Sequence, residues 1–495
     1  MFGVLGCRTN PFTLGAELAD MVLIINSRED LTLDAFCRVA WRSEAVALSP
    51  IVLEKIEVSR RNFLELIDQP EITIYGVNTG YGQRAKDRLN KEGRQNQATQ
   101  PTHHRASSWG DPLPQRVVRG IIFARLANFV DGHSAVSPHV AKAVVAMLAN
   151  ANQPYVPARG QGGAGEILSL SHLFLELTAN TTLAEKDMLS LINGSPAATA
   201  LIADAALSAK VRVNIACEVL ALAAEAFQVP RGHFAVELET YWNNPHDAWA
   251  LQTLRQLIEG GQDAARRPYQ APVSIRILPR ILGQAHLAVT NAETVARQSL
   301  LAITDNPVII PKHERQTDEA VISTGGYHNA QAPAALDAMV AAYTNLIVLT
   351  GRIAAKLLDA SVSLMPQFLG YPENGSYLGC LPMAIVGYEE EARMLAQPTL
   401  LPGSESGGFG QDDVASPIFL GWKKFDRVSE LLEQSLASLA PIAVRALTTS
   451  NRPVPYKLQQ LSSLVSETFS KTSTTVPFGL EINNLAEKFR ERIYK

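Results

Sequence analysis

The sequence predicts a mainly α-helical protein in which long helices pack as a bundle. Beyond residue 115 the chain consists of long Ala- and Leu-rich segments, and their apolar residues recur at helical spacing. Several of these segments are longer than the roughly 11 residues of an average helix. Helical segments follow one another without strands between them, which favours a bundle over an alternating α/β fold.

The composition is that of a globular protein with a large core. Of the 495 residues 46% are hydrophobic and 19% are charged, and the formal net charge is -4. This weak negative charge gives no basic surface for a nucleic acid or an anionic membrane. The cysteines form no CxxC pair, so buried or idle thiols are expected rather than disulfides or a metal site; they are Cys7, Cys37, Cys217 and Cys380.

The sequence predicts neither secretion nor membrane insertion. The N-terminal sequence MFGVLGCRTNPF lacks a basic start followed by a long apolar run, so no secretory signal is expected. The longest apolar stretches, such as 338–351, fall short of the ~20 residues that span a bilayer. A cytoplasmic location is therefore expected.

The elements can be placed in order along the chain. An amphipathic helix is expected to begin near Leu31, with Thr32 or Asp34 as its N-cap. A short β-prone run, Ile72 to Tyr75, ends at Gly76. Long helices are expected over 115–130, 166–192, 197–228, 284–303, 333–360 and 425–447. We expect an N-terminal domain, 1–200, that carries a tyrosine turn and a Gly-rich loop, and a helical bundle, 201–495.

The loops carry the residues that could do chemistry. Tyr75 begins the segment Y-G-V-N-T-G-Y-G, whose glycines permit the positive φ angles and the motion of a lid. A phenol can serve as a base near neutral pH when its surroundings favour the phenolate. The segment from Val156 to His172 reads V-P-A-R-G-Q-G-G-A-G-E-I-L-S-L-S-H. Further motifs are Asn193-Gly194, Gln270-Ala-Pro-Val-Ser-Ile-Arg276, Ala302-Ile-Thr-Asp-Asn-Pro307, Gly325-Gly-Tyr-His328 and Gln411-Asp412-Asp413-Val414.

The Gly-rich loop also satisfies the pattern G-x-G-x-x-G of dinucleotide-binding proteins. That interpretation needs a preceding strand and a βαβ unit. Two prolines upstream, Pro154 and Pro157, make a poor strand, and helical segments surround the loop. The dinucleotide interpretation is rejected, and a helix N-terminus that binds a substrate carboxylate or carbonyl remains open.

From about Leu31 to Val414 these motifs, in this order, resemble the histidine and phenylalanine/tyrosine ammonia-lyase and aminomutase family. The resemblance implies the long-helix fold of the ammonia-lyases with an active site built from loops. In that family an Ala-Ser-Gly tripeptide cyclises and dehydrates to an electrophilic methylidene-imidazolone group. The corresponding residues here are Ala164 and Gly165, followed by Glu166. Neither Ala nor Gly can lose water, so this electrophile is not expected to form.

The resemblance also implies roles for single residues. It makes Tyr75 the catalytic base on a mobile lid, and Arg276 the partner of the substrate carboxylate, a role that suits a bidentate guanidinium. Asn193 would help to hold the same carboxylate, and Gln270 belongs to the motif of Arg276. Val273 stands where the family has a tyrosine. The ordinary alternatives are a tyrosine packed beside a turn, an Asn-Gly helix terminator and a surface arginine.

Three further motifs are expected to line the pocket. His104 aligns with the substrate-selecting residue of tyrosine-type lyases, and Arg105 falls where histidine lyases carry a histidine. These two residues could contact an acidic or phenolic substrate, or they could be solvated loop residues. Tyr327, Gln411 and Asp412 lie in motifs that match the family's later elements.

Three hypotheses about function follow. The first is an enzyme without the prosthetic group, in specialised metabolism, that uses Tyr75 for proton abstraction with cyclisation, addition or elimination on an amino-acid-derived, perhaps carrier-tethered, substrate. The second is a conventional aromatic or histidine ammonia-lyase or aminomutase, and the third is a non-catalytic binding paralogue. No metal, nucleotide or flavin is implied, and the resemblance implies a homotetramer.

Overall fold

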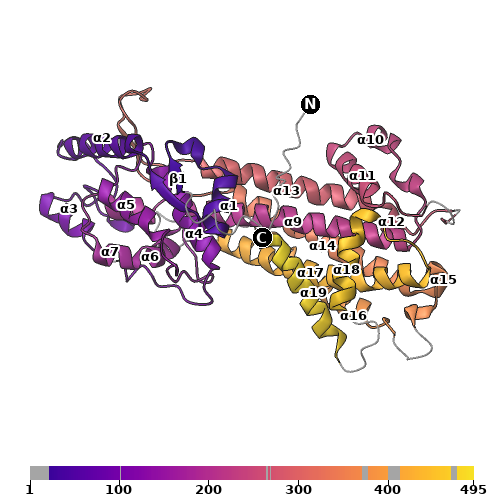
Figure 1. Ribbon diagram of the computed structural model, residues 1–495. Coiled ribbons are helices and arrows are strands. Elements are labelled where there is room, and N and C mark those ends of the chain that lie inside the picture. Colours follow the sequence, from indigo (N-terminus) through magenta and orange to yellow (C-terminus); the bar gives the residue numbers. More distant parts are fainter. Residues whose placement is uncertain are drawn as a thin grey trace. The chain divides into compact units, whose positions relative to one another are not determined.

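The computed structural model describes residues 22–100, 102–262, 266–267, 269–370, 377–399, 413–469 and 476–494. The chain forms two compact units (Figure 1). Unit 1 comprises Met1–Asp204, Ala296–Ala330 and Pro402–Phe419, and unit 2 comprises Ala205–Val295, Gln331–Leu401 and Leu420–Lys495. The chain first leaves unit 1 after Asp204, near the domain boundary expected at residue 200, and later segments return to it.

Unit 1 contains shorter helices and all the described strands. Strands β1 (Val22–Ile25) and β2 (Ala45–Leu48) pair in parallel, and β3 (Val308–Ile309) pairs antiparallel with β4 (Val321–Ile322). The helices that lie within unit 1 are α1 (Leu33–Arg42), α2 (Pro50–Ile67), α3 (Lys91–Ala98), α4 (Gln115–Arg125), α5 (Pro138–Met147), α6 (Ile167–Leu173), α7 (Leu175–Asn180) and α8 (Asp187–Ile192).

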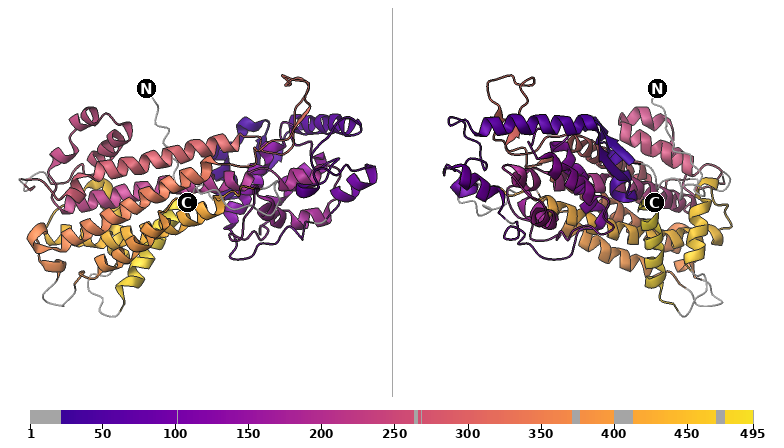
Figure 2. Two further views of the ribbon diagram at one scale, coloured as in Figure 1. Left: turned by 180° about the vertical axis from the view of Figure 1, so that it is seen from behind. Right: turned by 60° about the vertical axis from the view of Figure 1, so that its left-hand side comes forward.

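Unit 2 is the bundle of long helices. α9 (Pro196–Ala226) carries the chain into it, and α9, α13, α14 and α17 run side by side (Figures 1 and 2). The helices that follow α9 are α10 (Glu237–Trp242), α11 (Pro245–Leu257), α12 (Val273–Arg276), α13 (Leu278–Leu300), α14 (Gln331–Leu358), α15 (Ala360–Ser363), α16 (Leu381–Leu395), α17 (Ile418–Thr449), α18 (Gln459–Thr468) and α19 (Phe478–Tyr494). The prediction of a mainly α, long-helix bundle is confirmed.

Short 3-10 turns join these elements, at Arg28–Asp30, Gly82–Arg84, Leu126–Asn128, Arg231–Phe234, Gln367–Leu369 and Tyr456–Leu458. The expected start of α1 is also confirmed. The Thr32 hydroxyl accepts a hydrogen bond from the backbone N–H of Ala35, 3.1 Å away, which satisfies one of the unpaired donors of the first turn.

Helix α14 lies in the core of unit 2 and packs along α16. By length and composition it is apolar enough to cross a membrane, although the sequence suggested that no apolar stretch is long enough. Within the protein, 67% of its most apolar window is buried. Its residues therefore have the burial expected of a core helix.

Two local predictions were wrong. The helix expected over 166–192 is three helices, because Phe174 leaves the helical region at φ -101° and Lys186 is left-handed at φ +74°. The β-prone run from Ile72 to Tyr75 forms no strand, because residues 72–74 are irregular and a turn follows over 75–78. The Asn78 side chain accepts from the Ile74 N–H at 2.7 Å and donates to the Ile72 carbonyl at 2.8 Å, which bends the backbone.

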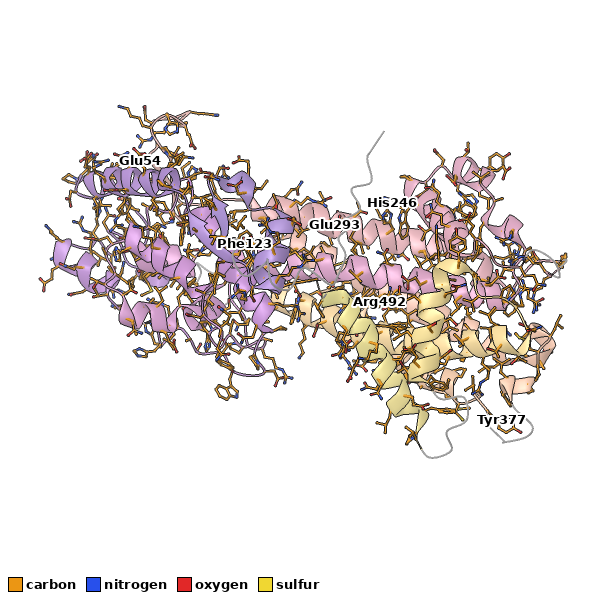
Figure 3. The ribbon with its side chains drawn as sticks, viewed as in Figure 1. Glu54, Phe123, His246, Glu293, Tyr377 and Arg492 are labelled. Carbon is orange, nitrogen blue, oxygen red and sulfur yellow. The ribbon has the colours of Figure 1, made fainter. Side chains whose placement is uncertain are left out.

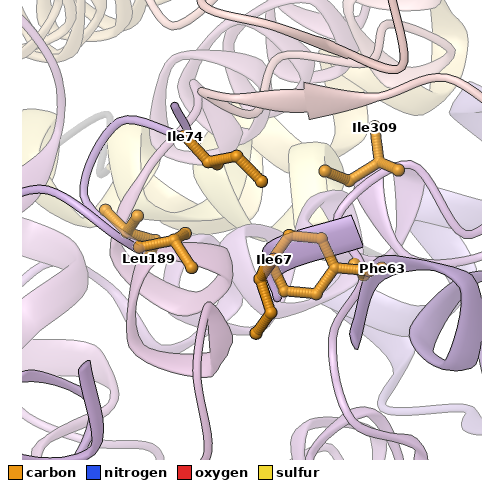
Figure 4. Close-up of a cluster of buried hydrophobic side chains, with 7 residues drawn as sticks. Phe63, Ile67, Ile74, Leu189 and Ile309 are labelled. Atoms are coloured by element: carbon orange, nitrogen blue, oxygen red, sulfur yellow. The ribbon is translucent and has the colours of Figure 1, made fainter. Parts of the chain in front are cut away.

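One buried cluster fixes this turn in unit 1. We call it the α2 core cluster, and its residues are Phe63, Ile67, Ile74, Val77, Ala135, Leu189 and Ile309 (Figure 4). Each of these side chains is exposed by 5% or less. Because Ile74 and Val77 flank Tyr75, apolar burial anchors the turn to α2, α8 and β3.

Candidate active site

The Tyr75 turn is held by its own side chains. Asn78 closes it as described, and the Gly76 N–H donates to the Thr79 hydroxyl at 3.0 Å. Gly76 has φ +66°, and a Cβ there would lie 2.8 Å from Leu189 and Tyr81, so the position requires glycine. The Gly82 N–H donates to the Tyr75 phenolic oxygen at 3.1 Å. That oxygen is therefore fixed, and the donor would stabilise negative charge on it.

A second tyrosine of the same motif lies beside the first. The Arg105 guanidinium lies 5.4 Å from the centre of the Tyr81 ring. Burial raises the pKa of Tyr81 to about 12, although the positive charge of Arg105 acts in the opposite direction. Tyr81 therefore stays protonated near neutral pH. Sequence reasoning assigned no role to Tyr81, although the motif contains it.

The Gly-rich loop is irregular from Arg159 to Glu166 and is held by hydrogen bonds within unit 1. The Ser416 N–H donates to the Gly163 carbonyl at 2.8 Å. The Gln161 amide donates to the Ser108 hydroxyl at 3.0 Å and to the Pro157 carbonyl at 2.6 Å. The loop is thus hydrogen-bonded to an earlier segment at Ser108 and to a later one at Ser416.

Tyr327 borders this loop. A Cβ at Gly165 would lie 3.5 Å from the Tyr327 ring, which is ordinary van der Waals contact. The loop therefore has room for a larger side chain. From Pro157 to Leu168 the sequence contains no Ser, Thr or Cys. The residues present do not fit a methylidene-imidazolone, because none of them can lose the water that creates its double bond.

Glu166, the last residue of the loop, caps the long helix α9. Its two carboxyl oxygens accept hydrogen bonds from the backbone N–H groups of Ala197 and Ala198, each at 2.6 Å. Burial raises the pKa of Glu166 to about 8, although these two donors and Arg125 act in the opposite direction. The first amides of α9 are thus engaged by the chain's own carboxyl group.

Asn193 ends α8 beside a buried arginine. Its amide donates to the Asn306 carbonyl at 2.9 Å, and its side-chain oxygen accepts from the Gly194 N–H at 3.0 Å. Arg125, which is fully buried, donates to the carbonyl groups of Ser190 and Asn193. Gly194 has φ +94°, so Asn193-Gly194 also terminates a helix, as the structural alternative required.

Burial lowers the pKa of Arg125 to about 10, while Asp305 and Glu166 favour its charged form. Asp305 in turn pairs with Lys186 at 2.7 Å, and both side chains are 0% exposed. Arg125 and Lys186 were missed from the sequence. Asp305 lies within a motif that was recognised, but its burial could not be inferred from that motif.

Arg276 and Gln270 lie in unit 2, whereas Tyr75, Asn193 and Tyr327 lie in unit 1. Arg276 ends α12 and donates from Nε to the Ala271 carbonyl at 3.0 Å. The Ala271 N–H donates to Nε2 of His233 at 3.0 Å. Burial lowers the pKa of His233, and the positive charge of Arg276 adds to the shift. Gln270 is exposed.

The other residues predicted for the site make few contacts that bear on it. His104 is exposed, and its ring packs edge-on against that of His103, with 5.8 Å between the ring centres. Gln411 and Asp412 lie outside the described residues. Within the described part of the chain, no group of three or more His, Cys, Asp or Glu side chains could hold a metal ion.

The fold defines a class of protein, because its bundle of long helices is that of the helical ammonia-lyases. Residues 31–183 and 177–471 match the family model described as aromatic amino acid lyase. The chain belongs to this family.

Its relatives include histidine ammonia-lyases. That of Streptococcus pyogenes serotype M18 is 24% identical over 484 residues, covering 91% of this chain and 92% of the relative. That of Deinococcus radiodurans is 30% identical over 373 residues, covering 69% of each chain.

Solved structures share the fold. Ergothionase from Treponema denticola, an ergothioneine-degrading enzyme, superposes with a TM-score of 0.87 at 18% identity, covering 96% of this chain and 99% of that one. Tyrosine aminomutase from Streptomyces globisporus gives a TM-score of 0.85 at 22% identity, covering 96% and 98%.

Proposed function

We propose that this protein is a lyase that eliminates a group other than ammonia from an amino-acid-derived substrate, without a methylidene-imidazolone. The observation that carries the proposal is the composition of the loop from Pro157 to Leu168. The loop lies beside Tyr327 and ends at Glu166, but it has no side chain that can be dehydrated. Tyr75 accepts a hydrogen bond from the Gly82 N–H, and the Asn193 amide donates to the Asn306 carbonyl.

Tyr75 is the base in this proposal. Its oxygen, oriented by the Gly82 N–H, takes a proton from the β-carbon of the substrate. The electrons of that C–H bond form the new carbon–carbon double bond, and the electrons of the C–N bond leave with the amine. Asn193, which lies in the same unit as Tyr75, holds the substrate carboxylate and so keeps the β-carbon at the base.

The leaving group decides whether an electrophile is needed. A primary amine leaves poorly and requires activation, whereas a quaternary ammonium group departs directly as a neutral tertiary amine. Ergothioneine, on which the structurally similar Treponema denticola enzyme acts, carries such a group. We therefore propose a betaine of an imidazole or aryl amino acid as the substrate, with an arylacrylate as the product.

A second candidate is a conventional histidine ammonia-lyase. It is supported by the curated relatives, which match 91% of this chain at 24% identity. It requires a modified loop, so it predicts that the peptide spanning Ala164 has lost water. We further propose a homotetramer, as the family resemblance implies, and a cytoplasmic location.

The test compares matched substrates. Purified full-length protein is incubated with histidine, phenylalanine and tyrosine and with their N,N,N-trimethyl betaines, and the absorbance of the conjugated acid is followed. Elimination from betaines alone, together with an unmodified loop peptide in mass spectrometry, is the expected result. Equal turnover of the primary amines and a dehydrated loop would establish the second candidate. Binding without turnover of either series would indicate a non-catalytic paralogue.

A further inference from the structure

We propose that a cavity in unit 1, outside the candidate active site, binds a small amphipathic carboxylate. The cavity has a volume of about 400 Å³ and lies between α2 and the segment that follows β3. This volume falls within the range of small-molecule sites, roughly 300–1,000 Å³. None of the residues predicted from the sequence to act in catalysis or substrate binding lines it.

The floor of the cavity is apolar. Val58, Phe63 and Leu66 of α2 line one side, and Ile309 and Ile310 line the other. Phe63 and Ile309 belong to the α2 core cluster (Figure 4), so the floor is the outer surface of a packed core. A rigid apolar surface of this kind favours an aryl or branched alkyl body, because burying that body removes apolar area from water.

The cation that would recognise the carboxylate is Arg315. Its Nε donates to the Ile310 carbonyl at 3.0 Å, which orients the guanidinium beside the apolar floor. No carboxylate of the described residues pairs with Arg315 or with Lys312, the next cation along the lining. Two η nitrogens therefore remain for a carboxylate, in the geometry that a guanidinium fork offers.

Most acidic groups of the lining are already engaged. Asp131 is held by Arg28 at 2.6 Å and by Lys55 at 3.0 Å. Glu314 lies 3.7 Å from Nε2 of His133 and 3.5 Å from Nε2 of His313. Glu54, the third acid, lies on the exposed face of α2 (Figure 3). Arg315 and Lys312 are the cationic side chains of the lining that no carboxylate of the described residues holds.

The probe is 3-phenylpropanoate, which joins an aryl body to a carboxylate, and binding to the full-length protein is measured by calorimetry. 3-Phenylpropanol has the same body without the charge and serves as the ligand control. We expect the acid to bind and the alcohol to bind at least about tenfold more weakly, since a charge-assisted hydrogen bond contributes roughly 1.5–3 kcal/mol. Equal binding of the two ligands would overturn the proposal, as would no binding of the acid.

Two variants locate the site. Arg315→Gln removes the guanidinium charge, and Val58→Glu places a carboxylate over the apolar floor. Both variants are expected to weaken binding of the acid at least about tenfold. The first loses the charged partner of the ligand's carboxylate, and the second repels that carboxylate. Arg61→Gln, on the same helix α2 but outside the lining, should bind like the wild type.

Unaltered circular dichroism and thermal unfolding establish that each variant is folded. If one lining variant fails to fold, the other decides. A folded lining variant that binds the acid as the wild type does would overturn the proposal. Because the probe also resembles the arylacrylate of the proposed function, the two lining variants, which lie outside the candidate active site, distinguish binding in the cavity from binding there.

Discussion

Lys186 Nζ lies 2.7 Å from Asp305 Oδ2, and both side chains are completely buried. Lys186 immediately precedes α8, which ends at Asn193, while Asp305 immediately precedes Asn306, whose carbonyl accepts from the Asn193 amide. The ion pair therefore joins the start of α8 to the segment around Asn306. That segment orients the side chain of Asn193, which caps the other end of α8. Burial lowers the pKa of Lys186, and the charge of Asp305 opposes that shift.

Removing Lys186 should strongly destabilise the protein. Lys186→Met would leave the Asp305 carboxylate buried without its partner, which costs roughly 3–5 kcal/mol. Arg84→Met is a matched control, because Arg84 pairs with Asp87 on the surface, at side-chain exposures of 68% and 55%. That change should cost less than about 1 kcal/mol. Urea denaturation measures both, and equal losses would contradict the structural role of the buried pair.

Glu166 should make stability depend on pH. Its pKa is raised by burial from 4.5 to about 8, so between these values the folded state holds a proton that the unfolded state has released. Unfolding releases that proton, and the contribution of Glu166 to stability falls by about 1.4 kcal/mol per pH unit across this window. It is fully present below pH 4.5 and lost as the pH rises through 8.

The measurement compares the wild type with Glu166→Gln, which cannot ionise. The free energy of unfolding of each is determined at several pH values between 4.5 and 8, and their difference isolates Glu166. The variant should gain stability relative to the wild type as the pH rises. A difference that stays constant, or changes in the opposite sense, would show that Glu166 is ionised throughout.

The sequence could predict the helical bundle because long apolar repeats at helical spacing have few other solutions. It could not predict that 166–192 breaks into three helices. One break lies at Phe174, and α8 begins after the left-handed Lys186, whose side chain pairs with Asp305, 119 positions away. Composition also could not show that a turn replaces a strand near Tyr75, because a single side chain, Asn78, bends the backbone there.

The candidate site could be predicted in part. The motifs of Tyr75, Asn193 and Gly165 are local in sequence, so their residues could be found by reading along the chain. Arg125 carries no local signal, since a buried arginine inside an apolar helix looks like any other arginine of that helix. Its role arises from three carbonyl groups of another segment, which only the folded structure brings to it.

Gly194 is expected to tolerate no side chain. Its φ is +94°, and a Cβ would lie 2.6 Å from Nη2 of Arg125 and 2.9 Å from the Thr304 hydroxyl. Gly194→Ala should therefore destabilise the protein by roughly 1–3 kcal/mol through backbone strain alone. Gly387→Ala should have the opposite sign, because Gly387 lies within α16 and a Cβ there meets nothing within 4 Å. An alanine in a helix is favoured over glycine by about 0.5–1 kcal/mol.

Thermal unfolding of the two glycine variants gives the comparison directly. We expect the melting temperature of Gly194→Ala to fall and that of Gly387→Ala to rise. A Gly194→Ala variant as stable as the wild type would mean that Arg125 does not pack against this turn as the structure shows.

Tyr75 and Tyr81 should differ sharply in their contribution to turnover. Tyr75→Phe removes the oxygen that the Gly82 N–H orients, so on the betaine substrate kcat should fall by about 10²–10⁴, the usual contribution of a general base. The KM should change little, because the aromatic ring that borders the substrate remains. Tyr81→Phe is the matched control, since burial raises the pKa of Tyr81 to about 12 and keeps it protonated. Steady-state kinetics that show equal losses of kcat for the two variants would remove Tyr75 from the role of base, because a neutral phenol and a proton acceptor would then contribute alike.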